Sequence, residues 1–192
     1  MPWLREIIKT IKKQRKYASF FEGPDKDIKE LWVLKLLFES MSKTHSCPYK
    51  NPLSSTKDPP DCIADDTNGN KIGFEISELV DERSVRQGQR GQQELKIWEN
   101  EELIEKLKEI VCEKDKKEYH GGPYFKIVLV IFTDEFCLDP ETIIPVVYNH
   151  TFPETYQINE VYFLFSYDPR IHTYPYVKLN ISPNKKRGAD GE

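Results

Sequence analysis

Two acidic residues, Asp61 and Glu75, are spaced so that a β-hairpin would bring them side by side. Asp61 opens the short segment 61–65, and Glu75 lies in the segment 71–77. Asn68-Gly69 stands between them and is the dipeptide most typical of a tight hairpin turn. Two carboxylates held a few ångströms apart are costly unless a cation neutralises them, and a hard cation with oxygen ligands is suited to do so. The spacing therefore predicts a site for Mg²⁺ or Mn²⁺ on Asp61 and Glu75.

The residues around Glu75 predict which way its side chain points. Successive side chains of a strand face opposite sides, so Glu75 shares one face with Gly73 and Ser77. The opposite face is entirely apolar and consists of Ile72, Phe74 and Ile76. We therefore expect the apolar face to pack into a core while Glu75 faces a cleft.

This arrangement resembles the PD-(D/E)XK nuclease superfamily, the fold of many restriction endonucleases and Holliday-junction resolvases. The matching residues are Pro60-Asp61, the Asn-Gly turn and the half-motif from Gly73 to Ser77. The segment from Glu30 to Leu37 is similar to the family's first helix, whose glutamate can complete the metal site. The resemblance spans about residues 25–167. It implies metal ligands at Asp61 and Glu75 and an accessory catalytic acid at Glu30.

The sequence departs from the family pattern at Ser77, where a lysine is expected two residues after the acid. Lys71 lies on the same strand face as Glu75, but four residues at about 3.3 Å each place it roughly 13 Å away. Lys96 is the better candidate for a migrated catalytic lysine. It follows Gln89, Gln92 and Gln93 at helical spacing, so an early helix start would point these side chains into the cleft. The alternative is that all four face solvent at a frayed helix start.

Other acids compete for places in the site. Glu39 lies one helical face away from Glu30, and Glu30 is preferred because Val33, Leu34 and Leu37 share its side. Glu78 falls on the opposite strand face from Glu75, unless the strand has a bulge or has already ended. Asp65 and Asp66 are expected to be turn residues.

The elements that must position these residues follow from hydrophobic spacing. Helices are predicted over 3–18, 25–41 and 89–117, and a short one begins at Asp139-Pro140 and runs toward Tyr148. Residues 42–60 are rich in Pro, Ser and Thr and are predicted to form a loop. Residues 124–132 form a nearly continuous apolar run that is typical of a central strand covered on both faces. Two further strands are predicted over 161–167 and 176–181.

This element order predicts an α/β fold with a central mixed β-sheet flanked by helices. The resemblance makes it a restriction-endonuclease-like three-layer sandwich. We expect a single domain over 1–192, with an N-terminal helical extension at 1–22, a nuclease-like core at 25–167 and a disordered tail at 183–192.

Composition limits the functions that the protein can have. The net charge of −4 argues against a protein that coats nucleic acid through bulk positive charge. Any contact with nucleic acid must therefore be local, as at the basic stretches 9–16 and 185–187. No run approaches the roughly 18 apolar residues of a membrane span, and no apolar block of signal-peptide length opens the chain. We expect a cytoplasmic protein that does not bind membranes. Its four cysteines lie far apart and are expected to be reduced thiols.

Two functions are consistent with these features. The first is a metal-dependent nuclease in which Asp61 and Glu75 bind Mg²⁺ or Mn²⁺ and Lys96 aligns the nucleophile, with DNA expected ahead of RNA as the substrate. A homodimer is an option, because nucleases of this kind that cut both strands commonly work as dimers. The second is a catalytically inactive domain of the same fold that binds nucleic acid or a protein. Ser77 and the acidic net charge support this alternative.

Overall fold

The computed structural model describes residues 25–81, 83, 96–135 and 137–182. The predicted helix 3–18, the extension at 1–22 and the tail at 183–192 lie outside the described residues. So do Gln89, Gln92 and Gln93. Within the part that is described, no helix combines the length and the apolar character needed to cross a lipid bilayer.

A mixed six-stranded sheet forms the centre of the molecule, with strand order β1-β2-β3-β4-β6-β7. The pairs β3–β4 and β4–β6 are parallel, and the pairs β1–β2, β2–β3 and β6–β7 are antiparallel. The bounds are β1 Tyr49–Ser54, β2 Cys62–Asp66, β3 Lys71–Glu78, β4 Lys126–Thr133, β6 Ile158–Phe165 and β7 Tyr176–Lys178. A small second sheet pairs β5 (Thr151–Phe152) with β8 (Asn180–Ile181).

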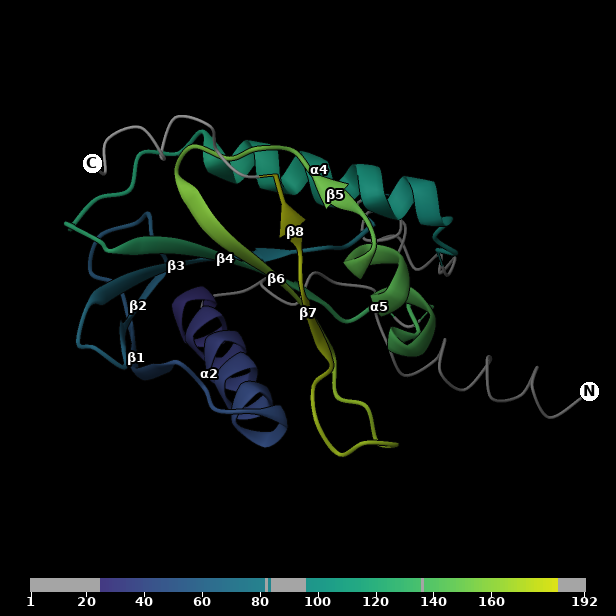
Figure 1. Ribbon diagram of the computed structural model, residues 1–192, viewed down its shortest axis with the longest axis horizontal. Helices are drawn as coiled ribbons and strands as arrows, with labels where there is room; N and C mark the ends of the chain where they lie inside the picture. Colours follow the sequence, from purple (N-terminus) through teal and green to yellow (C-terminus); the bar gives the residue numbers. More distant parts are fainter. Residues whose placement is uncertain (1–24, 82, 84–95, 136, 183–192) are drawn as a thin grey trace, which may run out of the picture.

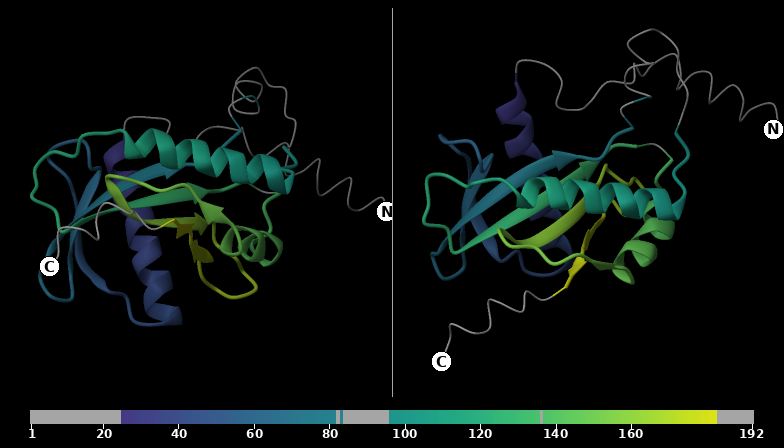
Figure 2. Two further views of the ribbon diagram at one scale, coloured as in Figure 1. Left: turned by 45° about the horizontal axis from the view of Figure 1, so that its top comes forward. Right: turned by 90° about the horizontal axis from the view of Figure 1, so that it is seen from above.

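Helices cover both faces of the six-stranded sheet. Helix α2 (Lys26–Thr44) lies on one side, and α4 (Asn100–Asp115) lies on the other (Figure 1). Helix α5 (Pro140–Tyr148) lies beside the N-terminal end of α4 (Figure 2). The described residues therefore form an α/β fold with a mixed sheet between helical layers, as expected.

Strand alternation divides the apolar side chains into two cores. Ile72, Phe74 and Ile76 pack with residues of α2, as the pattern around Glu75 predicts. The other core combines α4 and α5 with alternate residues of β4 and β6. Strand β4 contributes to both cores and pairs with a neighbour on each side, which confirms the predicted interior strand.

The β2–β3 hairpin forms at the predicted Asn-Gly turn. Gly69 adopts a φ of 86°, a left-handed conformation that glycine accepts without steric cost. Asp66 accepts hydrogen bonds from the backbone N–H groups of Asn68 and Asn70, each at 2.8 Å. The carboxylate of Asp66 therefore holds the turn, as expected for a turn residue.

The predicted loop at 42–60 is wrong in two parts. Helix α2 continues to Thr44, and residues 49–54 form strand β1. This strand lies at the sheet edge and pairs only with β2, so it tolerates Pro52, which cannot donate to a β-ladder. Asn51 sits at a φ of 56° within an irregular stretch of the register. Strand β1 therefore lacks the alternating pattern that would have revealed it.

Two other boundaries differ from the predictions. Residues 96–99 are not helical, and α4 begins at Asn100, so Trp98 packs on the core from an irregular segment. The strand predicted at 176–181 splits at Leu179 into β7 and β8, and β8 leaves the main sheet to pair with β5. The short helix predicted from Pro140 to Tyr148 is confirmed.

Candidate metal centre

Three carboxylates meet at the start of β2 and the middle of β3. Asp58, Asp61 and Glu75 each present an oxygen atom, and these three atoms lie within 4.8 Å of one another. Asp58 is exposed, Asp61 is partly buried and Glu75 is fully buried, so the cluster leads from solvent into the protein. The structure thus brings Asp61 and Glu75 together, as the hairpin predicts. Asp58 lies in the segment predicted as a loop and was not anticipated.

The sheet register fixes the position of Asp61. Cys62 pairs with Phe74 across the antiparallel hairpin, which places Asp61 beside Glu75. The Ile76 N–H donates a hydrogen bond of 2.7 Å to Asp61 Oδ2. Burial and then the charge of the Glu75 carboxylate raise the pKa of Asp61 to about 7, although the Ile76 N–H opposes the rise. The pKa of Asp61 therefore lies where proton loss can be coupled to cation binding near neutral pH.

Glu75 has one oxygen that is saturated and one that is not. Its Oε1 accepts hydrogen bonds from Lys114 Nζ at 2.7 Å and Lys117 Nζ at 2.6 Å. Its Oε2 is buried and has no hydrogen-bond partner. An unsatisfied buried acceptor costs about 1–3 kcal/mol, which a bound cation would offset. The free oxygen is therefore an independent sign that the cluster fits a cation.

The two lysines on Glu75 lie at and just beyond the C-terminal end of α4. Lys114 is in the last turn of the helix, and Lys117 lies two residues past its last residue, Asp115. Burial opposes the charge of Lys117, but the hydrogen bond and the charge of Glu75 raise its pKa above the ordinary value. The order of the elements could have predicted this contact. Because β3 and β4 are parallel, the helix between them must return the chain from the end of β3 toward the start of β4. That path brings the last turn of α4 back over β3.

Lys96 does not reach these carboxylates, contrary to the prediction. Its Nζ lies 2.6 Å from Glu102 Oε1 and 5.4 Å from the centre of the Trp98 ring. Lys96 precedes α4, and Asn100 and Lys114 lie about 21 Å apart along the helix axis. Lys96 is therefore held at the wrong end of α4. Lys71 also points elsewhere and donates to the Gly121 carbonyl at 2.9 Å.

Glu30 lies near the cluster, and Glu39 does not join it. Glu30 is buried, and its Oε1 is 3.1 Å from Lys26 Nζ. Burial raises the pKa of Glu30, Lys26 offsets part of the rise, and the charge of Glu30 in turn raises the pKa of Asp61. Glu39 pairs with Lys43 at 2.7 Å on the helix surface. The geometry thus favours Glu30 over Glu39, and its catalytic role remains a prediction.

The remaining acids considered from the sequence are not part of the cluster. Asp65 accepts a hydrogen bond from Asn51 Nδ2 at 2.9 Å, and Asp66 holds the hairpin turn. Glu78 ends β3 and is not among the three clustered acids.

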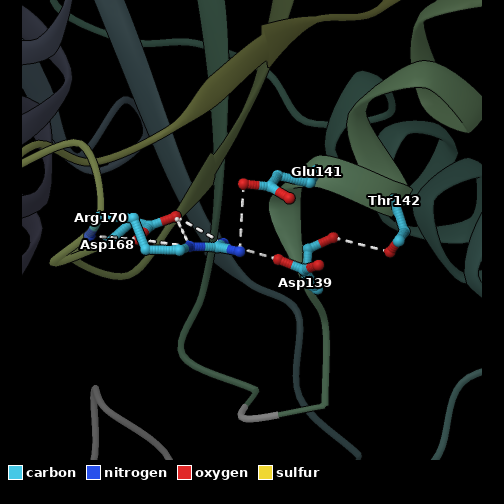
Figure 3. Close-up of polar contacts among 5 residues, drawn as sticks. All are labelled: Asp139, Glu141, Thr142, Asp168 and Arg170. Atoms are coloured by element: carbon cyan, nitrogen blue, oxygen red, sulfur yellow. Dashed lines mark hydrogen bonds and ion pairs between the residues drawn. The ribbon is translucent and has the colours of Figure 1, made fainter.

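A second polar cluster surrounds Arg170 (Figure 3). The guanidinium lies 2.7 Å from Asp139, 2.7 Å from Asp168 and 3.2 Å from Glu141. Asp139 and Glu141 belong to the start of α5, whereas Asp168 and Arg170 follow β6. Because these carboxylates occupy the guanidinium nitrogens, the cluster ties two segments together and leaves Arg170 with little capacity to bind a ligand.

Comparison with known proteins leaves the site as the guide to function. No protein-family model, no curated protein and no solved structure matches this chain. Function is therefore inferred from the cluster of Asp58, Asp61 and Glu75 and from the two lysines beside it.

Proposed function

We propose that this protein is a metal-dependent nuclease that hydrolyses phosphodiester bonds in DNA or RNA. Asp58, Asp61 and Glu75 would hold Mg²⁺ or Mn²⁺, because carboxylate oxygens are the ligands that these hard cations prefer. The observation that carries the proposal is the unpartnered Oε2 of buried Glu75 within a set of three converging carboxylates.

The residues of the chain have separate parts in this proposal. A bound divalent cation supplies an activated water and offsets charge on the scissile phosphate. The Ile76 N–H holds Asp61 in a fixed orientation. Lys114 and Lys117 keep positive charge beside Glu75, where an ammonium group can orient the attacking water and stabilise developing negative charge. Glu30 is the accessory acid.

Similarity to the PD-(D/E)XK superfamily supports the proposal. The helices and strands around the cluster follow in the order α2, β1, β2, β3, α4 and β4, which fits a restriction-endonuclease-like fold. Ser77 stands where that family has its lysine. We propose that Lys114 and Lys117 take over the role that the sequence suggested for Lys96. DNA remains the first expectation for the substrate.

A cleavage assay on the full chain tests the carboxylates. With Mg²⁺ or Mn²⁺, the wild type should cut labelled DNA or RNA, and EDTA should stop the reaction. Asp61→Asn and Glu75→Gln should each lower the rate by about 10²-fold or more, because each removes charge from the cation site. Glu39→Gln is the matched control and should retain activity, since its side chain pairs with Lys43 at the surface. Equal cleavage by an Asp61→Asn/Glu75→Gln double variant would contradict the proposal.

The same cleavage assay shows whether Lys114 and Lys117, or instead Lys96, contribute to catalysis. Lys114→Ala/Lys117→Ala should lower the rate by about 10² to 10³-fold, the usual effect of removing a group that stabilises charge in the transition state. Lys96→Ala should stay close to wild type, because Lys96 pairs with Glu102. The reverse result would restore the role predicted for Lys96.

The alternative is an inactive domain of the same fold that binds nucleic acid or a protein. It is favoured by the two ammonium groups that already lie on Glu75 and neutralise it without a metal. Calorimetric titration with Mn²⁺ distinguishes the two functions. Binding that is lost in Asp61→Asn/Glu75→Gln supports the nuclease, whereas wild-type protein that binds no cation supports the inactive domain.

A further inference from the structure

A groove of about 460 Å³ lies beside the candidate metal centre. The segment that leads into β4 and the start of β6 line it, with Tyr119, residues 122–127, Gln157 and Asn159 as the lining residues. Its volume is within the range of sites that hold small ligands or parts of larger ones. The lining segment joins α4 to β4 and lies at the left of Figure 1.

The groove borders the strand that carries Glu75, because Gly73 of that strand faces two of the lining residues, Ile127 and Tyr124. Gly73 and Glu75 lie on the same face of β3, two residues and therefore about 7 Å apart. A Cβ atom at Gly73 would lie 3.1 Å from Pro60 Cγ and 3.4 Å from Tyr124 Cδ1. The Tyr124 ring therefore approaches the residue that precedes Asp61. Burial and then the charges of Glu75, Asp115 and Asp61 raise the pKa of Tyr119, which places this second ring within the field of the cluster.

The rings of the groove are presented for stacking. Phe125 leaves 68% of its surface exposed, although its backbone N–H is fixed to the Lys71 carbonyl at 2.9 Å. Lys71 Nζ lies 5.0 Å from the centre of the Tyr124 ring. Phe125 thus offers an exposed ring, and its neighbour Tyr124 holds a lysine ammonium over its own half-buried ring. Sites for single-stranded nucleic acid combine these two features, since an exposed ring stacks on a base and a cation attracts the backbone.

Polar groups complete the groove. Gln157 and Asn159 are exposed, and Asn159 Oδ1 accepts the Ile127 N–H at 2.9 Å, which leaves its Nδ2 as a donor. Amide side chains can hydrogen-bond to the edges of an unpaired base. The aliphatic part of Lys57 lies near Gly121, whose carbonyl accepts a hydrogen bond from Lys71 Nζ, so two lysine side chains approach the segment that leads into the groove.

We propose that this groove is a base-stacking subsite that selects single-stranded or unpaired nucleic acid. The inference rests on the proposed nuclease function and deepens it by naming the substrate class. In a duplex the faces of the bases are stacked on their neighbours and cannot pack on Phe125. An unpaired base can do so while the adjoining backbone lies at Asp61 and Glu75.

Binding in EDTA tests the subsite without cleavage. Fluorescence anisotropy with the full chain compares a labelled single-stranded oligonucleotide with the duplex of the same sequence. The wild type should bind the single strand more tightly. Phe125→Ala should weaken that binding by about 5-fold or more, the lower end for loss of one stacked base, with little change for the duplex. Phe125→Trp should preserve it. Tyr148→Ala is the matched control, because Tyr148 is an aromatic residue with 66% exposure on α5.

The possible outcomes keep the subsite and the nuclease apart. A Phe125→Ala variant that binds the single strand as tightly as wild type would overturn the subsite, as would tighter binding of the duplex by the wild type. If cleavage then still depends on Asp61 and Glu75, the nuclease proposal stands alone. Single-strand binding that depends on Phe125, in a protein that cuts nothing, would retain the subsite and remove the nuclease.

Discussion

At the level of single residues, the two oxygens of the buried Glu75 carboxylate have different surroundings. Oε1 contacts the ammonium groups of two lysines, whereas Oε2 has no partner, and the carboxylates of Asp58 and Asp61 lie close by. This difference between the two oxygens determines what the site can do. The lysines stabilise the charge of Glu75 in the absence of metal, and the free Oε2 keeps a ligand position available. No lysine of the described residues lies at hydrogen-bonding distance from Asp61, and the Ile76 N–H offsets only part of the effect of burial on its pKa.

Asp61 should make the metal-free protein less stable as the pH rises. Its pKa is about 7 in the folded protein, above the ordinary value of 3.8. The folded state therefore holds a proton that the unfolded state releases, and stability present below pH 4 is lost as the pH rises through 7. The loss has an upper limit of about 4 kcal/mol, since one pKa unit corresponds to about 1.4 kcal/mol.

Urea unfolding in EDTA between pH 4 and 8 measures this effect. Asp61→Asn cannot titrate, so it should be more stable than wild type at pH 8 and close to it at pH 4. Glu39→Gln, which lies outside the cluster, should keep the wild-type pH dependence. Parallel curves for wild type and Asp61→Asn would show that the pKa of Asp61 is not raised by folding.

At the level of elements, the C-terminal end of α4 positions both lysines. Asp115, which stands between them, accepts hydrogen bonds of 2.8–3.0 Å from the backbone N–H groups of Tyr156, Gln157 and Ile158. Tyr119 adds a bond of 3.0 Å to the Lys114 carbonyl. The end of α4 is thereby fixed to the start of β6.

Asp115→Ala should therefore affect both stability and catalysis. It leaves three backbone N–H groups without their acceptor and should lower the free energy of unfolding by about 1–3 kcal/mol. Cleavage should fall as well, because the last turn of α4 and the residues just after it no longer hold Lys114 and Lys117 on Glu75. Glu113→Ala, an exposed neighbour, is the control for both urea unfolding and the nuclease assay. Lost stability with full activity would show that the lysines do not need this anchor.

The sequence allowed prediction of those elements whose local pattern agrees with their environment. The hairpin was readable from Asn68-Gly69, and the interior strand from its unbroken apolar run. Strand β1 was not, because an edge strand that contains Pro52 depends on its partner β2 rather than on its own pattern. The site residues divide in the same way into predictable and unpredictable ones. The proximity of Asp61 and Glu75 could be predicted, because the register of one hairpin sets it. The positions of Asp58, Lys114 and Lys117 could not, because they depend on the path of a loop and of the helix between β3 and β4.

At the level of the whole molecule, the candidate metal centre joins parts that are distant in sequence. Asp58 and Asp61 precede β2, Glu75 lies in β3, and the two lysines lie at the end of α4 and just after it. A partly buried acid, Glu160, lies on the opposite face of the sheet. It accepts hydrogen bonds from the hydroxyls of Tyr49 and Tyr162 and forms ion pairs with Lys126 and Lys178. Burial raises its pKa, but these contacts outweigh burial and lower the pKa to about 2. Both oxygens of Glu160 therefore have partners, whereas Oε2 of Glu75 has none. Among the described residues, the acids that converge closely enough to hold a cation are those of the Glu75 cluster.

Mn²⁺ should stabilise the whole chain, because the carboxylates converge only in the folded state. A cation present at 100 times its dissociation constant contributes about 2.7 kcal/mol, which corresponds to a rise in melting temperature of roughly 5–10 °C for a chain of this size. The rise should be larger at pH 8 than at pH 6, because Asp61 must lose its proton to bind the cation. Thermal unfolding followed by circular dichroism measures it, with Glu39→Gln as a control that responds like wild type. If Asp61→Asn/Glu75→Gln gains as much stability from Mn²⁺ as wild type does, the cation binds elsewhere and the three converging carboxylates are a structural feature without a metal.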